Sequence, residues 1–228
     1  MVVCEDVDLD AAAVAAVSGM GLRRSSGQSC QSTSRILVHE SIAAELTERL
    51  VAQIEALRIG NPSEDSVEIG PLAFRQHYER VLQYIQIGRD EGARVLTGGG
   101  RPPGIDGGFF VAPTVFADVT PDMRIAREEI FGPVIGIMTW KDEDEVIKLA
   151  NGVDYGLTAN IWTQDLNRAY RLARAIEAGT QWINGAAGAR PVGVPFGGYK
   201  QSGLGREASL SEVVSFTREK SLIMNFPS

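Results

Sequence analysis

The fold is decided by residues 157–184, which read LTANIWTQDLNRAYRLARAIEAGTQWIN. The run begins with a short apolar segment, LTANIWT, and ends with another, TQWIN, and both are typical of buried strands. Between them, Asp165 is placed to cap a helix and Gly179 to stop it. The apolar side chains of this helix recur on one face: Ala169, Leu172, Ala173 and Ile176. A strand, a helix and a second strand in this order predict two parallel strands joined by a helix.

The same alternation runs through the rest of the chain. Segments that favour strands are 35–40, 93–100, 108–116 and 133–140, and segments that favour helices are 10–20, 43–57, 76–92 and 143–151. We therefore predict an α/β fold with a largely parallel sheet. The ending, VVSFTREKSLIMNF at 213–226, has strand character and no helix after it. We expect it to be an edge strand that pairs with another chain.

Composition excludes several classes of protein. The 228 residues are 44% hydrophobic and 22% charged, which is the balance of one globular domain, with or without an appendage. The net charge of -7 argues against a general nucleic-acid or membrane-surface binder. No apolar run approaches the roughly 20 residues of a membrane span. The acidic start, MVVCEDVDLD, resembles neither a secretory signal nor a transit peptide, so we expect a cytoplasmic protein.

Cys30 is the first residue that could carry chemistry. It lies in SSGQSCQSTSR, residues 25–35, among small residues that would let a substrate approach, with arginines nearby that favour a thiolate. The alternative is a buried structural cysteine, the commoner role of a lone cysteine. The chain has only one other cysteine and two histidines, and their spacing does not fit a zinc site, so we predict no metal.

Two further segments are candidates for binding. REEIFGPV, residues 127–134, offers a carboxylate that could accept ribose hydroxyls and an aromatic ring that could flank a flat ring. Taken alone, the segment is better explained as a surface helix end followed by a turn. VPFGGYKQSGLGRE, residues 194–207, holds four glycines but neither the dinucleotide fingerprint nor a phosphate-binding P-loop.

In combination these segments are much more specific. GQSC, then EEIFGPV about 100 residues later, then INGAAG and PFGGYKQSGLGRE resemble the aldehyde dehydrogenase superfamily in order and spacing. NPSEDSVEIGPL, DYGLTANIWTQD and EAGTQWING resemble the same family, so the likeness covers essentially the whole chain. The amino-acid sequence of the glycine-rich run is most similar to that of betaine-aldehyde-like and broad-substrate members of the superfamily. The resemblance implies the three-layer catalytic domain of that fold at residues 1–210 and an oligomerisation tail at 211–228.

The resemblance also implies a mechanism and a set of site residues. Cys30 matches the nucleophile that attacks an aldehyde, and hydride then passes to NAD or NADP to leave a thioester that water hydrolyses. Glu129 matches the residue that holds the nicotinamide ribose, and Phe131 matches the aromatic beside it. Phe196 matches a residue of the substrate tunnel. Glu207 matches a glutamate assigned either to proton relay or to a salt bridge.

The same resemblance implies that much of the enzyme lies outside this sequence. Family members have roughly 250 further residues before this point, with the dinucleotide-binding domain, the general-base glutamate and an oxyanion-stabilising asparagine. Met1 stands just after the place of that glutamate, so we expect a C-terminal half without a dinucleotide-binding domain. Losing such groups costs factors of about 10² to 10⁴ each. We therefore expect the isolated chain to be inactive and its binding of NAD or NADP to be weak.

Arg23 and Arg190 depart from the family pattern, because apolar or aromatic residues usually stand at both places. One interpretation is that these arginines bind the far carboxylate of a semialdehyde substrate, since guanidinium pairs well with carboxylate. The other, which we favour, is that Arg23 faces solvent and Arg190 lies on a loop. His77 and Arg80 lie on the helix where the family sometimes contacts the cofactor, but we assign neither a role.

The resemblance to a family oligomerisation strand predicts a homodimer or homotetramer through residues 221–226. Two alternatives to a simple enzyme stay open at this point. The chain could be a non-catalytic assembly module that pairs with full-length subunits, or one half of a split enzyme. In each case the expected small-molecule partner of the complete protein is an aldehyde, with no nucleic acid and no membrane.

Overall fold

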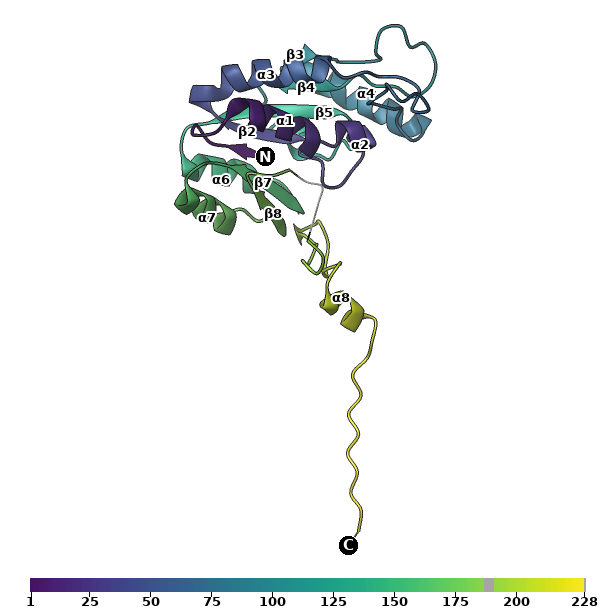
Figure 1. The fold of residues 1–228 in the computed structure, drawn as a ribbon, viewed down its shortest axis with the longest axis vertical. Coiled ribbons are helices and arrows are strands. Elements are labelled where there is room, and N and C mark those ends of the chain that lie inside the picture. Colours follow the sequence, from purple (N-terminus) through teal and green to yellow (C-terminus); the bar gives the residue numbers. More distant parts are fainter. Residues whose placement is uncertain (187–190, 228) are drawn as a thin grey trace.

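The computed structural model describes residues 1–186 and 191–227 (Figure 1). A seven-stranded sheet runs through the body in the order β3-β4-β5-β2-β1-β7-β8. Its strands are β1 (Val2–Val3), β2 (Arg35–His39), β3 (Arg94–Thr97), β4 (Thr114–Ala117), β5 (Val134–Trp140), β7 (Thr158–Trp162) and β8 (Thr180–Ile183). Only the β3–β4 pair is antiparallel among these neighbours. The α/β fold and the largely parallel sheet are therefore confirmed.

Helices cover both faces of the sheet and make three layers (Figure 1). The helices on one face are α1 (Leu9–Gly19) and α3 (Ala43–Glu55). Those on the other are α4 (Arg75–Asp90), α5 (Arg124–Arg127), α6 (Glu143–Asn151) and α7 (Leu166–Ala175). Neighbouring residues of a strand feed opposite cores: Ile36 and Val38 pack with α1 and α3, whereas Leu37 packs into the other cluster. This period of two is the expected consequence of the pleat.

Residues 157–184 fold as the sequence predicts, with one exception. β7 and β8 pair in parallel, and the Asp165 carboxylate caps α7 by accepting from the amides of Asn167 and Arg168. The helix, however, ends at Ala175 rather than near Gly179. Gly179 instead lets two backbones approach, because a Cβ there would lie 1.9 Å from the Gly197 carbonyl oxygen. The prediction of Gly179 as a helix stop was therefore wrong.

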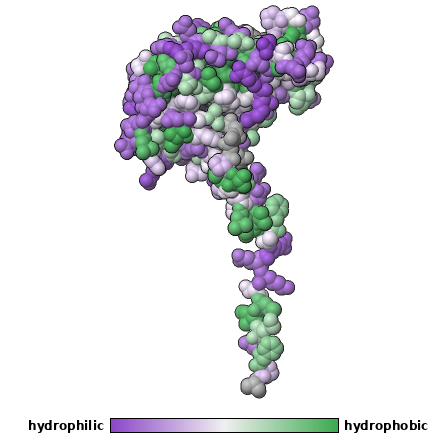
Figure 2. Space-filling model, viewed as in Figure 1, coloured by the Kyte–Doolittle hydropathy of each residue, from purple (hydrophilic) through white to green (hydrophobic). Residues whose placement is uncertain are grey.

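The C-terminal region leaves the body of the molecule. A two-stranded ribbon of β6 (Tyr155–Gly156) and β9 (Tyr199–Lys200) ties residues near 200 to the body, and α8 (Leu210–Ser215) follows. Residues 217–227 extend away and pair with no strand of the described chain (Figure 1). The predicted strand is thus wrong over 213–215, which are helical. The tail (residues 217–227) exposes Leu222, Ile223, Met224 and Phe226, which form green patches in Figure 2.

None of the helices in the described part of the chain has the length and apolar character required to cross a membrane.

Candidate active site

Cys30 lies at the amino-terminal end of the central strands, in the Cys30 loop (residues 26–34) between α2 (Leu22–Ser25) and β2. Its thiol is exposed, whereas Cys4 in the sheet is buried, and both cysteines are free. Gln28 anchors the loop: its amide oxygen accepts from the Ala73 amide at 2.9 Å, and its nitrogen donates to the Ser25 carbonyl at 3.0 Å. The interpretation of Cys30 as a buried structural cysteine does not fit this position.

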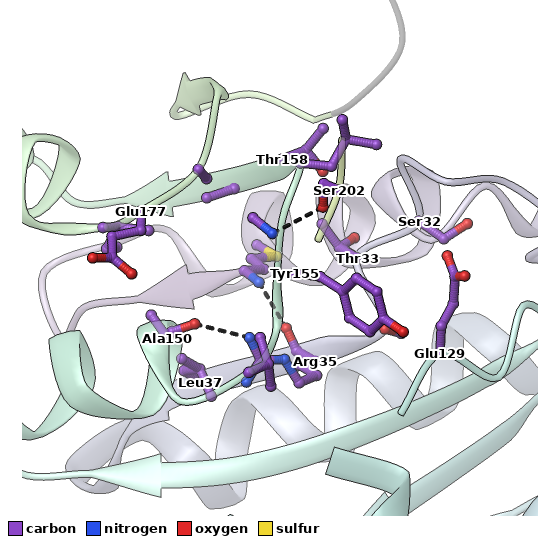
Figure 3. Close-up of a pocket in the computed structure, with 18 of the residues that line it drawn as sticks. Ser32, Thr33, Arg35, Leu37, Glu129, Ala150, Tyr155, Thr158, Glu177 and Ser202 are labelled. Atoms are coloured by element: carbon purple, nitrogen blue, oxygen red, sulfur yellow. Dashed lines mark hydrogen bonds between the residues drawn. The ribbon is translucent and has the colours of Figure 1, made fainter. Parts of the chain in front are cut away.

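Cys30 and Glu129 line one pocket of about 350 Å³, which we call the Cys30 pocket. Its walls are the Cys30 loop, the segment that enters β7, and the turn at Gln201–Ser202 (Figure 3). In Figure 3 the Glu129 carboxylate points toward Ser32, and Arg35 and Tyr155 are further residues of the lining. The pocket thus opens at the amino ends of the parallel strands β1, β2 and β7. Ligands of open parallel sheets more often bind at the carboxyl ends.

The glutamate loop (residues 128–133) carries Glu129 and Phe131 between α5 and β5. Phe131 takes a left-handed backbone conformation, with φ of 59°, and its ring is 39% exposed. Ile130 between them is buried. The loop therefore presents two exposed side chains on either side of a buried apolar residue.

The two loops meet at a pair of glycines. A Cβ at Gly27 would lie 2.5 Å from the Gly132 carbonyl oxygen, and a Cβ at Gly132 would lie 2.7 Å from a methyl of Val81 on α4. Gly27 also has a φ of 74°, which disfavours a side chain. The backbones of the two loops and the surface of α4 are therefore stacked without room for an added carbon. This stacking places the Cys30 loop against the loop that carries Glu129.

The glycine-rich segment brings Phe196 and Glu207 together, but outside the Cys30 pocket. The two residues exchange both backbone hydrogen bonds, at 2.9 and 2.7 Å. The Phe196 ring is buried, whereas Glu207 is exposed and forms no ion pair with any described residue. Neither residue lines the pocket that contains Cys30 and Glu129.

Arg23 does not line the Cys30 pocket. Arg23 pairs with Glu68, with 2.8 Å from its Nε to the carboxylate, and its side chain is half-exposed. A substrate carboxylate would have to compete with Glu68 for this guanidinium. Arg190 lies outside the described residues. Across the described ranges, no cluster of His, Cys, Asp and Glu side chains is arranged to hold a metal ion.

Arg35 lines the Cys30 pocket, and the sequence indicated its nearness to Cys30 but not its partners. Its guanidinium donates to the carbonyls of Leu149 and Ala150, at 3.1 and 3.0 Å, at the carboxyl end of α6. Burial lowers the pKa of Arg35 to about 10. The cation meets the negative end of that helix dipole, which favours its charged form. The one sequence feature that could have indicated this buried role is an arginine at the start of an otherwise apolar strand.

Comparison with known proteins agrees with this geometry. The model of the aldehyde dehydrogenase family matches residues 1–222. The chain belongs to the aldehyde dehydrogenase family. It is 44% identical to the betaine aldehyde dehydrogenase of Brucella anthropi over 224 residues, which are 97% of this chain and 45% of that protein. The chain therefore spans less than half the length of this curated relative.

Solved aldehyde dehydrogenase structures confirm the fold of this partial domain. The NAD+ complex of the Bacillus cereus enzyme superposes with a TM-score of 0.92 at 40% identity, covering 99% of this chain and 45% of that one. The NAD-dependent aldehyde dehydrogenase of Sinorhizobium meliloti gives a TM-score of 0.87 at 45% identity, covering 91% and 41%.

Adding one methyl group at the contact of the two loops should be costly. We expect Gly27→Ala to lower the free energy of unfolding by about 1–3 kcal/mol more than Gly104→Ala, because only the first meets backbone. Gly104 is a matched control, since its φ of 76° is similar and no atom lies within 4 Å of a Cβ there. Urea unfolding of the two variants measures the difference. Equal losses would contradict the packing described.

The glutamate loop should also contribute an acid-sensitive part of the stability. The Arg124 guanidinium and the Tyr84 hydroxyl hold the Glu128 carboxylate, which lowers the pKa of Glu128 from 4.5 to about 2. Because the folded pKa lies below the unfolded one, this contribution is present above pH 4.5 and is lost as the pH falls toward about 2.

Chemical denaturation across this pH range tests that assignment. Glu128→Gln should be less stable than the parent chain above pH 4.5, and the difference should disappear toward pH 2. Asp122→Asn is the control, because Asp122 is exposed and contacts no described cation. A constant difference for Glu128→Gln at every pH would contradict the account.

Proposed function

We propose that this chain is the catalytic half of an NAD(P)-dependent aldehyde dehydrogenase, which oxidises an aldehyde to a carboxylic acid with Cys30 as the nucleophile. The observation that carries the proposal is that Cys30 and Glu129 line one pocket. The family match and the betaine aldehyde dehydrogenase relative support the same reaction. Betaine aldehyde is accordingly the first substrate to test, and a semialdehyde bound through Arg23 and Arg190 is the alternative.

The proposed reaction at Cys30 proceeds in three steps. The Cys30 thiolate adds to the carbonyl carbon of the aldehyde, which forms a C–S bond and a thiohemiacetal. This intermediate then loses a hydride, with two electrons, from the same carbon and becomes a thioester. Water attacks the thioester, the C–S bond breaks, and the products are a carboxylate and the free thiol. When bound, NAD or NADP supplies the hydride acceptor.

The residues present fit a nicotinamide cofactor on the side of the glutamate loop. The Glu129 carboxylate is exposed toward the pocket and can accept hydrogen bonds from ribose hydroxyls. Phe131 does not line the pocket, but its ring is exposed two residues farther along the same loop and can flank a planar ring. Two solved structures of similar aldehyde dehydrogenases contain NAD+, which supports the proposal of a nicotinamide cofactor for this chain.

We further propose that the isolated chain does not turn over. The Cys30 thiol forms no hydrogen bond with any described residue, so no described side chain is bonded to it as a base. The chain also spans only 45% of the Brucella relative, so groups of the complete enzyme lie elsewhere in that protein. The same observation supports a second candidate, in which this chain is one half of a split enzyme or a non-catalytic assembly module.

Reduction of NAD(P) in the presence of aldehydes tests the function. We expect no turnover by the pure 228-residue protein and measurable turnover when it is combined with the amino-terminal half of the Brucella relative. In the combination, Cys30→Ala should lower activity by about 10³-fold or more, because the step that forms the C–S bond is lost. Cys4→Ala, at the buried cysteine, should retain most of the activity.

Three results would overturn parts of this proposal. Turnover by the pure chain that Cys30→Ala abolishes would contradict its inactivity. Equal activity of Cys30→Ala and Cys4→Ala in the combination would remove Cys30 as the nucleophile. No activity in any combination with a folded first half would favour the assembly module. Faster oxidation of succinic semialdehyde than of neutral aldehydes would support the roles of Arg23 and Arg190.

We also propose that the tail joins copies of this chain into a homodimer or homotetramer. Its exposed apolar side chains are what such an interface would bury. Ile223→Asp should shift the protein to monomer in analytical ultracentrifugation, because a charge would be buried with them. Val192→Asp is the control, since Val192 is as exposed but lies outside the tail. A parent chain that is already monomeric would contradict this proposal.

A further inference from the structure

One face of α4 presents a row of donors to the glutamate loop. His77, Arg80 and Tyr84 follow one another at spacings of three and four residues, so they share one side of the helix. The His77 Nε2 lies 2.7 Å from the Phe131 carbonyl oxygen, and an Arg80 Nη donates to the Glu129 carbonyl at 3.3 Å. The Tyr84 hydroxyl donates to the Glu128 carboxylate at 2.6 Å. Three successive donors thus reach three residues of the loop.

The His77 contact acts on the most strained residue of the loop. Phe131 has a φ of 59°, a conformation that is unfavourable for a residue with a Cβ. Such a conformer persists only where neighbouring groups hold it. Because a carbonyl only accepts hydrogen bonds, His77 must carry a proton on Nε2 to make this contact. The neutral Nε2–H tautomer and the imidazolium both satisfy that requirement, so the contact does not depend on the charge of His77.

Packing alone does not orient the two exposed side chains of the loop. Ile130, between Glu129 and Phe131, is buried, whereas the two side chains that flank it are exposed. The rings of His77 and Phe131 are 6.1 Å apart at their centroids and meet edge to face. The directions of Glu129 and Phe131 are therefore set by the backbone of the loop, and His77 and Arg80 bond to the carbonyls of these same two residues.

We propose that His77 is a positioning residue, supported by Arg80, that keeps Phe131 in its left-handed conformer and so keeps Glu129 and Phe131 directed at the cofactor. This inference rests on the proposed function, because it assigns the cofactor contact to these two side chains. It adds to that function a residue that acts through the loop backbone. Gln is the conservative replacement for His77, since its amide nitrogen can donate from a similar distance.

Amide hydrogen exchange of residues 128–132 in the 228-residue chain tests the positioning. We expect His77→Leu to accelerate exchange by about fivefold, the loss expected for one net hydrogen bond, and His77→Gln to stay close to the parent chain. Exchange across β5 should not change in either variant, which separates loosening of the loop from general destabilisation. Unchanged exchange of the loop in His77→Leu would overturn the inference.

A variant at Phe131 tests directly whether His77 acts on the strained backbone of that residue. In Phe131→Gly the left-handed conformer is no longer strained, because glycine adopts positive φ readily. Removing the His77 donor in this background should therefore accelerate loop exchange less than it does in the parent chain. An equal effect in both backgrounds would show that His77 does not act by holding the Phe131 conformer.

Saturation-transfer NMR with NAD separates this inference from the proposed function. In the chain combined with the first half of the Brucella relative, transfer to the nicotinamide protons should weaken in His77→Leu and recover in His77→Gln. Equal transfer in the parent and His77→Leu would overturn the role of His77 in presenting the cofactor residues. No transfer in the parent combination would contradict the cofactor assignment itself, whatever the exchange result.

Discussion

The close approach of Gly27 to Gly132 is the contact on which the rest of the site depends. A single added carbon at Gly27 would lie 2.5 Å from a carbonyl oxygen, so the two loops meet backbone to backbone. Gly132 in turn lies against Val81, which brings α4 into the same stack. The loop that carries Cys30, the loop that carries Glu129 and the helix beneath them therefore form one packed unit. Residues about 100 positions apart in the chain come to line one pocket in this way.

The parallel sheet gives this unit a rigid base. β1, β2 and β7 lie side by side, and their amino ends form the floor below Cys30. Arg35 links that floor to α6 by donating to the last carbonyls of the helix. A buried guanidinium with two backbone acceptors is costly to move, so the start of β2 is firmly placed. The position of Cys30, five residues earlier in the chain, follows from that placement.

Local patterns were sufficient for the fold, because strands, helices and caps depend on near neighbours in the sequence. The Asp165 cap and the buried face around Leu172 are of this kind. Contacts between distant segments were not predictable. The pairing of Arg23 with Glu68 and the donation from His77 to the Phe131 carbonyl join residues 45 and 54 positions apart. Gly179 shows the same limit. A glycine is needed there because the backbone of Gly197 lies close to it, and not because a helix ends there.

The site was predictable only in part, and its chemistry depends on how accessible Cys30 is. The motifs indicated Cys30 and Glu129, which share the pocket, whereas Phe196 and Glu207 pair with each other outside it. Mass spectrometry after alkylation of the folded chain is the most direct test, because Cys30 is exposed and Cys4 is buried with its pKa raised to about 11. The account predicts rapid labelling of Cys30 and labelling of Cys4 only after unfolding. Equal, slow labelling of both cysteines in the folded chain would contradict it.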